Sequence, residues 1–104
     1  MRAVAKAIGG YYPTPERVTN LIAPHLVAMR GNGELRLFDP CCGTGRALRT
    51  LSLTLPSPVI TVGVELHADR AREAHEMLTR VVHADAYKLR CTHYAFSVLF
   101  VNPP

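Results

Sequence analysis

The chain of 104 residues is long enough for one small domain and too short for two. Its composition, 48% hydrophobic and 19% charged, is that of a folded protein and excludes a disordered or low-complexity chain. Twelve Lys and Arg against eight Asp and Glu give a formal net charge of +4, which is compatible with a polyanionic partner but does not require one.

The three cysteines do not indicate a disulfide framework or a metal site. Cys41 and Cys42 are adjacent, Cys91 is distant, and a zinc site needs four convergent ligands. We therefore expect reduced, packed thiols and no metal. No stretch approaches the roughly 18 apolar residues of a membrane span, and the N-terminal segment is too interrupted for a signal peptide. A cytoplasmic location without membrane contact is expected.

The first predicted element is a helix that follows a segment stiffened by two prolines. Thr14 can cap this helix, Pro15 suits its first turn, and apolar residues recur at helical spacing from Val18 to Met29. Pro24 lies inside the pattern, where it removes a backbone hydrogen bond. We expect it to kink or split the helix.

After glycines at 31 and 33, β-branched runs alternate with helical patterns at the spacing of parallel βαβ units. The predicted strands are Leu35–Asp39, Val59–Glu65, Val81–Asp85 and Ala95–Val101, and the predicted helices are about Arg46–Leu55 and Ala68–Arg80. The fourth strand is almost uniformly apolar, which is typical of a strand covered on both faces. The predicted fold class is α/β, a Rossmann-like, truncated, doubly wound and mostly parallel sheet of about four strands with flanking helices.

Each predicted strand ends in, or is followed by, a polar residue that can line one crevice: Asp39, Glu65, Asp85 and Asn102. Ligands of open α/β sheets bind outside the carboxyl ends of the strands. The turn after the first strand carries Gly43 and Gly45 before a helix, but Leu48 stands where a dinucleotide fingerprint has its third glycine. The sequence therefore predicts a nucleoside site of another kind.

The acids indicate the ligand. Asp39 would repel a pyrophosphate and suits a cationic ammonium group. Glu65, about twenty residues beyond the glycine turn, is placed to accept hydrogen bonds from vicinal ribose hydroxyls. Asp85 can accept from an exocyclic amine. A ligand with an amino acid, a ribose and an adenine has this order, and S-adenosylmethionine fits it.

Five motifs in one order make the chain resemble a class I S-adenosylmethionine-dependent methyltransferase of the N6-adenine DNA type. They are Tyr12-Pro13-Thr14-Pro15, Asp39-Pro40-Cys41-Cys42-Gly43-Thr44-Gly45, Gly63-Val64-Glu65-Leu66, His83-Ala84-Asp85-Ala86 and Asn102-Pro103-Pro104. The resemblance covers nearly the whole chain, in the order of the subgroup that carries its target-recognition region last.

The resemblance implies roles for these residues. The cofactor-binding set is Tyr12, Thr14, Asp39, Cys41, Gly43, Gly45, Glu65, Leu66, Asp85 and Ala86. Thr14 would hold the methionine carboxylate and Asp39 the ammonium, with the glycines letting the backbone approach. Glu65 would bind the ribose, and Asp85 and the Ala86 N–H the adenine. The catalytic set is Asn102, Pro103 and Pro104, in which Asn102 and the Pro103 carbonyl accept from the target amine of a flipped base.

Several interpretations stay open. Asp39 and Asp85 can be turn or capping residues, Glu65 can be a solvated acid at the rim, and Asn102-Pro103 can be a plain strand-ending turn. The same motif start occurs in RNA and protein-glutamine methyltransferases, whose amine nucleophiles are similar. A third hypothesis is a non-catalytic oligomerising module derived from a methyltransferase.

The family motif continues with an aromatic residue that stacks on the target base, followed by further strands and the target-recognition region. Residues 1–104 are therefore expected to form a partial, cofactor-binding methyltransferase domain, with DNA as partner of the complete enzyme. We expect no methyl transfer by this chain alone. An unpaired edge of the strand Ala95–Val101 invites pairing, so a homo-oligomer or a companion chain is expected there.

Overall fold

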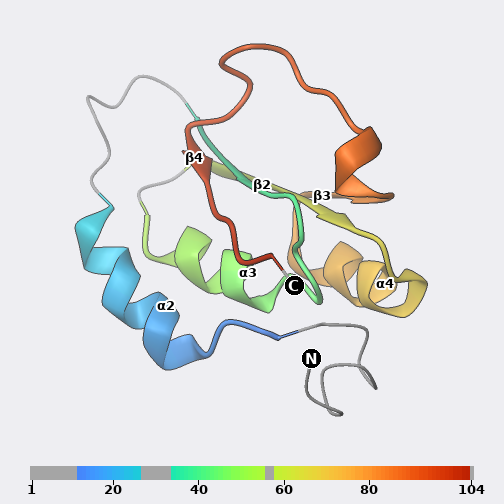
Figure 1. Ribbon diagram of the computed structural model, residues 1–104. Helices are drawn as coiled ribbons and strands as arrows, with labels where there is room; N and C mark the ends of the chain where they lie inside the picture. The colour runs from blue at the N-terminus through green and yellow to red at the C-terminus, as the bar shows by residue number, and fades with distance from the viewer. Residues whose placement is uncertain (1–11, 27–33, 56–57, 104) are drawn as a thin grey trace.

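The computed structural model describes residues 12–26, 34–55 and 58–103. Their strands form one parallel sheet of four, in the order β3-β2-β1-β4 (Figure 1). The strands are β1 (Leu35–Asp39), β2 (Val59–Glu65), β3 (Arg80–His83) and β4 (Val98–Leu99). The helices are α2 (Glu16–Ile22), α3 (Arg46–Leu53) and α4 (Ala68–Met77), with the short 3₁₀ turns η1 (Ala23–His25) and η2 (Ala86–Lys88). The predicted α/β, Rossmann-like class is confirmed.

The register of the sheet sets where the strands end. Leu37 of β1 lies opposite Thr61 of β2 and Val98 of β4, and Glu65 at the end of β2 lies opposite His83 at the end of β3. Because all four strands run in the same direction, their carboxyl ends meet at one edge of the sheet. The residues that follow the strands are therefore brought together there.

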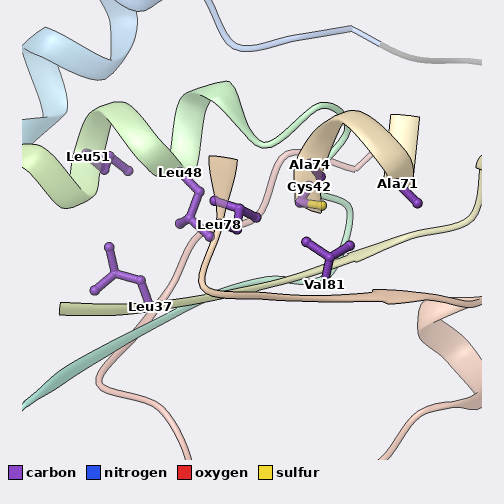
Figure 2. Packing of buried hydrophobic residues seen from close by; sticks show 8 residues of the cluster. All are labelled: Leu37, Cys42, Leu48, Leu51, Ala71, Ala74, Leu78 and Val81. Carbon is purple, nitrogen blue, oxygen red and sulfur yellow. The ribbon is translucent and has the colours of Figure 1, made fainter. Parts of the chain in front are cut away.

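The hydrophobic core lies between the sheet and the two helices α3 and α4. Figure 2 shows Leu48 and Leu51 of α3 and Ala74 of α4 packed over Leu37 of β1 and Val81 of β3. Leu37, Leu48, Leu51 and Ala74 are fully buried. The buried cluster consists of Leu37, Cys42, Leu48, Leu51, Ala71, Ala74, Leu78 and Val81.

The opposite face of the sheet is covered in a different way. Side chains alternate along a strand, so Phe38 and Val62 point away from α3 and α4, and both are half-buried. Phe96 stacks on Phe38 with ring centroids 4.4 Å apart. Phe96 belongs to the connection from β3 to β4, which arches over the sheet in Figure 1 and contains only the short turn η2.

Several boundaries match the sequence predictions and some differ. β1 and β2 have the predicted bounds. Pro24 splits its helix as predicted, because α2 ends at Ile22 and continues only as the 3₁₀ turn η1. Thr14 does not cap α2: Pro15 occupies the N-cap position, and no side chain caps the helix. Met29 and the glycines at 31 and 33 lie outside the described residues.

The predicted helix Ala68–Arg80 is shorter than expected. α4 ends at Met77 instead of Arg80, and β3 already begins at Arg80. The reason is Leu78, which leaves the helix with extended backbone and turns its side chain into the core, 7% exposed.

The fourth strand is where the sequence prediction was wrong in extent and burial. The predicted Ala95–Val101 strand is reduced to Val98–Leu99, and Leu99 is 62% exposed. Within the described residues this strand has one neighbour, β1, to which the flanking Ser97 and Phe100 N–H groups also donate. An apolar run indicates that a strand can pack against other apolar groups, but it does not indicate how long the strand is or how many strands pair with it. Pairing of another chain with this edge stays a prediction.

Among the described residues, no helix has the length and apolarity needed to cross a membrane.

Gly63 provides a test of the core, because a Cβ there would lie 2.6 Å from the Cys42 Sγ and 2.7 Å from the Leu78 Cδ1. We expect Gly63→Ala to lower the free energy of unfolding by about 1–3 kcal/mol through overpacking, measured by urea denaturation. The matched double variant Gly63→Ala/Cys42→Ala removes the sulfur and should recover part of this loss. An unchanged urea midpoint for Gly63→Ala would contradict the packing described here.

Candidate active site

A pocket of about 890 Å³ lies at the carboxyl edge of the sheet. Its walls include residues from the segment before α2, from the turns after β1, β2 and β3, and from the segment after β4. The sequence-predicted site residues that line it are Tyr12, Thr14, Asp39, Cys41, Glu65, Leu66, Asp85, Ala86, Asn102 and Pro103. Gly43 and Gly45 are not among its lining residues, and Pro104 lies outside the described residues.

Glu65, the last residue of β2, ties the floor of the pocket together. Its Oε1 accepts the Gly43 N–H at 2.9 Å, and its Oε2 accepts the His67 N–H at 2.7 Å. The Arg70 guanidinium of α4 lies 3.3 Å from the same Oε2. Glu65 is only 6% exposed, so its interpretation as a solvated rim acid is wrong. One carboxylate joins the turn after β1, the turn after β2 and the first turn of α4.

The glycine turn after β1 depends on backbone conformations that other residues rarely adopt. Gly43 has a φ of 58° and Gly45 a φ of 84°, both in the left-handed region. A Cβ on Gly45 would also lie 3.0 Å from the Leu78 Cγ. In the structure these glycines shape the turn and let it pack on Leu78. The Gly43 N–H donates to Glu65, and the Gly45 N–H donates to the Cys42 carbonyl within the turn.

Asp39 is a buried carboxyl group at the end of β1, 3% exposed. Its Oδ1 accepts the Cys41 N–H at 2.9 Å, so the interpretation as a turn residue is correct. The pKa of Asp39 is raised from 3.8 to about 6: burial is the main cause, the hydrogen bond from Cys41 lowers the pKa, and the nearby charge of Glu65 raises it. Since the folded pKa is raised, ionisation of Asp39 reduces stability as the pH rises through 6. A cation beside Asp39 would offset that cost.

Asp85 follows β3 and is half-buried. Its Oδ1 accepts the Tyr87 N–H at 3.0 Å and caps η2, so the capping interpretation is also correct here. Neither Asp39 nor Asp85 receives a hydrogen bond at its second oxygen from the described residues. Turn formation therefore leaves each of them one carboxylate oxygen with which to bind a ligand.

Asn102 follows β4, is exposed, and is held by the segment before α2. Its Nδ2 donates to the Tyr12 carbonyl at 3.1 Å and to the Thr14 Oγ1 at 2.9 Å. In Figure 1 the C-terminal segment ends beside the turn after β1. Local sequence patterns do not indicate these contacts, because they join residues 88 and 90 positions apart.

Sequence reasoning also missed charged pocket residues on the helices. Arg46, Arg70 and Glu73 line the pocket but belong to none of the recognised motifs. The position of Arg70 could have been predicted from the sequence. A short loop joins β2 to α4, so the first residues of α4 lie close to Glu65 at the end of β2.

The two cysteines near the glycine turn stay protonated. Burial raises the pKa of Cys42 to about 12, helped by Asp39 and Glu65, and burial and the three pocket acids raise the pKa of Cys41. Cys42 packs in the core and donates to the Gly43 carbonyl at 3.5 Å. Within the described ranges, no group of three or more His, Cys, Asp or Glu is arranged to hold a metal ion.

Residues 2–104 match the model of the "Uncharacterised methyltransferase family (DUF6094)". The chain belongs to this methyltransferase family. A comparison with curated proteins finds no match.

Solved structures resemble this family member in fold. One, described as a class I S-adenosylmethionine-dependent methyltransferase from Listeria monocytogenes, has a TM-score of 0.63 and 20% identity over 86% of this chain and 33% of its own. The plantazolicin methyltransferase BpumL, solved with SAH and a monoazolic desmethylPZN analog, has a TM-score of 0.62 and 14% identity over 83% of this chain and 34% of its own. At these identities the likeness shows the class I methyltransferase fold, and the chain spans about a third of their length.

Glu65→Gln tests the role of this carboxylate in holding the methyltransferase pocket. The amide places an NH₂ group opposite a backbone N–H and removes the charge that pairs with Arg70, so we expect a loss of about 3 kcal/mol in the free energy of unfolding. Asp69→Asn is the matched control. Its ion pair with Arg72 spans 3.1 Å between side chains that are each 77% exposed, and its loss should cost less than about 1 kcal/mol. Equal urea midpoints for the two variants would contradict the assignment.

Proposed function

We propose that this chain binds S-adenosylmethionine and forms the cofactor-binding part of a methyltransferase that acts on the N6 amino group of adenine in DNA. The observation that carries the proposal is the meeting of Asp39, Glu65, Asp85 and Asn102 around one pocket. They come from the ends of four different strands, and each has the hydrogen-bonding capacity that one part of this ligand and its target requires.

The pocket fits the cofactor in size and in chemistry. Its volume of about 890 Å³ is in the range of small-molecule sites, and its walls combine apolar and polar groups. Three carboxyl groups face a ligand that carries an ammonium group, two ribose hydroxyls and an exocyclic amine. A phosphate-bearing ligand would meet repulsion from Asp39 and Asp85, while the charge of Glu65 is already paired with Arg70.

At the amino-acid end, Asp39 supplies the counter-charge for the ammonium. Its raised pKa has burial as the main cause, so a bound cation stabilises the ionised form and is stabilised by it. Thr14 lines the same pocket and presents a hydroxyl group for the carboxylate.

At the ribose, the structure limits what Glu65 can accept. A carboxylate has about four acceptor positions, and the Gly43 N–H, the His67 N–H and Arg70 take three of them. One ribose hydroxyl can bind to the remaining position on Oε1. A bond from the second hydroxyl requires Arg70 to move aside or to share Oε2.

At the adenine and the target, Asp85 and Asn102 offer acceptors. The second oxygen of Asp85 can accept from the adenine amine, and the neighbouring Ala86 N–H can donate to a ring nitrogen. Asn102 Oδ1 and the Pro103 carbonyl can accept from the target amine and orient its lone pair. When bound, S-adenosylmethionine supplies the electrophilic methyl group. The net charge of +4 is compatible with a polyanionic substrate.

Calorimetry with S-adenosylmethionine and with S-adenosylhomocysteine tests cofactor binding. Because Asp39 must be ionised to pair with the ammonium, we expect the affinity to fall about tenfold between pH 7 and pH 5. Asp39→Asn should weaken binding at pH 7 and flatten this pH dependence, while Asp69→Asn should leave both unchanged. Absence of binding heat with both ligands would overturn the proposal.

Substrate class is tested with cofactor labelled in its methyl group, offered with DNA, RNA or protein. We expect no transfer by residues 1–104 alone. Labelled adenine in DNA that Asn102→Ala abolishes would support the substrate and refute the expected inactivity. Label in RNA or on protein glutamine would instead favour the alternative substrates.

A further inference from the structure

The side-chain amide of Asn102 uses both of its N–H donors within the protein. One N–H donates to the Tyr12 carbonyl at 3.1 Å and the other to the Thr14 hydroxyl oxygen at 2.9 Å. Both acceptors belong to the extended segment before α2. Asn102 is therefore attached at two points to a part of the chain that also lines the pocket.

These bonds fix which end of the amide faces outward. A backbone carbonyl can only accept, so the group opposite the Tyr12 oxygen must be the NH₂ of Asn102. Turning the amide over would place the Asn102 Oδ1 against the Tyr12 carbonyl oxygen and lose that hydrogen bond, whereas the Thr14 hydroxyl can donate or accept and fits either orientation. The Oδ1 atom accepts no hydrogen bond from the described residues and is left for a ligand. The site thus presents an acceptor and selects a hydrogen-bond donor.

The Thr14 hydroxyl has one proton of its own to donate. Its oxygen already accepts from Asn102, and none of the described residues accepts its proton. Thr14 is half-buried and lines the pocket, so an acceptor inside the pocket can take this proton. A carboxylate is the strongest such acceptor among the groups of the proposed cofactor.

We propose that Thr14 is a positioning residue for Asn102, and that a chain of hydrogen bonds runs from a ligand carboxylate through the Thr14 hydroxyl to the Asn102 amide. Hydrogen bonds in such a chain polarise one another. A carboxylate bound to Thr14 makes the hydroxyl oxygen a better acceptor for Asn102 Nδ2, which increases the negative charge on Oδ1. Cofactor binding then prepares the acceptor for the target amine. This inference rests on the proposed function for its ligand but not for the contact itself.

The chain is well suited to a direct test by nuclear magnetic resonance. It contains three asparagines, Asn20, Asn32 and Asn102, and no glutamine, so a ¹⁵N spectrum holds three side-chain NH₂ pairs. Asn102→Asp identifies the pair of Asn102, and the exposed Asn20 of α2 serves as internal reference. In the ligand-free chain, we expect Thr14→Val to speed solvent exchange of the Asn102 NH₂ protons about fivefold. Thr14→Ser, which keeps the hydroxyl, should restore the slow exchange.

Addition of S-adenosylhomocysteine, which keeps the carboxylate, tests the coupling. The Asn102 pair should shift in the wild type and in Thr14→Ser. In Thr14→Val, whose affinity we expect to be about tenfold weaker, saturation should leave the pair unshifted. Equal exchange in all three ligand-free chains, or an equal shift in saturated Thr14→Val, would overturn the inference. Absence of ligand binding with the ligand-free differences intact would overturn the proposed function and the coupling to a ligand carboxylate, but would support Thr14 as the residue that positions Asn102.

Discussion

A single buried carboxylate, that of Glu65, holds the candidate site together. Some backbone N–H groups in the loops after parallel strands have no partner in the sheet, and a buried N–H without a partner is costly. Glu65 satisfies two of them at once, at Gly43 and at His67, and the cation of Arg70 offsets its own charge. The shape of the pocket floor therefore depends on this one acid more than on any hydrophobic contact.

The same residue explains why the glycine turn has its form. For the Gly43 N–H to reach Glu65, the backbone must turn sharply after β1, and the left-handed conformations at Gly43 and Gly45 allow this. The turn also brings Cys42 against Gly63, two residues before Glu65 in β2. Packing and hydrogen bonding impose the same geometry, so the turn is rigid before any ligand arrives. Such preorganisation lowers the entropy that binding has to overcome.

Much of the fold and part of the site follow from the sequence. The βαβ periodicity placed β1 and β2 correctly, and the polar residue after each strand predicted which edge carries the pocket. Local patterns do not show long-range neighbours. The extent of β4 depends on the segments that lie beside it. Thr14 was predicted to cap α2 but instead accepts a hydrogen bond from Asn102. Arg70 forms an ion pair with Glu65 because the first turn of α4 lies close to the end of β2. Asp39, Glu65 and Asp85 also accept hydrogen bonds from backbone N–H groups of the turns while they line the pocket. Residue type alone does not reveal this double role.

The two bonds of Asn102 span 88 and 90 positions, nearly the whole described chain. Closing so long a loop carries a large entropic cost, and the bonds lie near the surface where water competes with them. This corner should be the last to form during folding and the first to open in the native state. The core and the corner around Asn102 thus differ in local stability, and this corner can open without loosening the sheet.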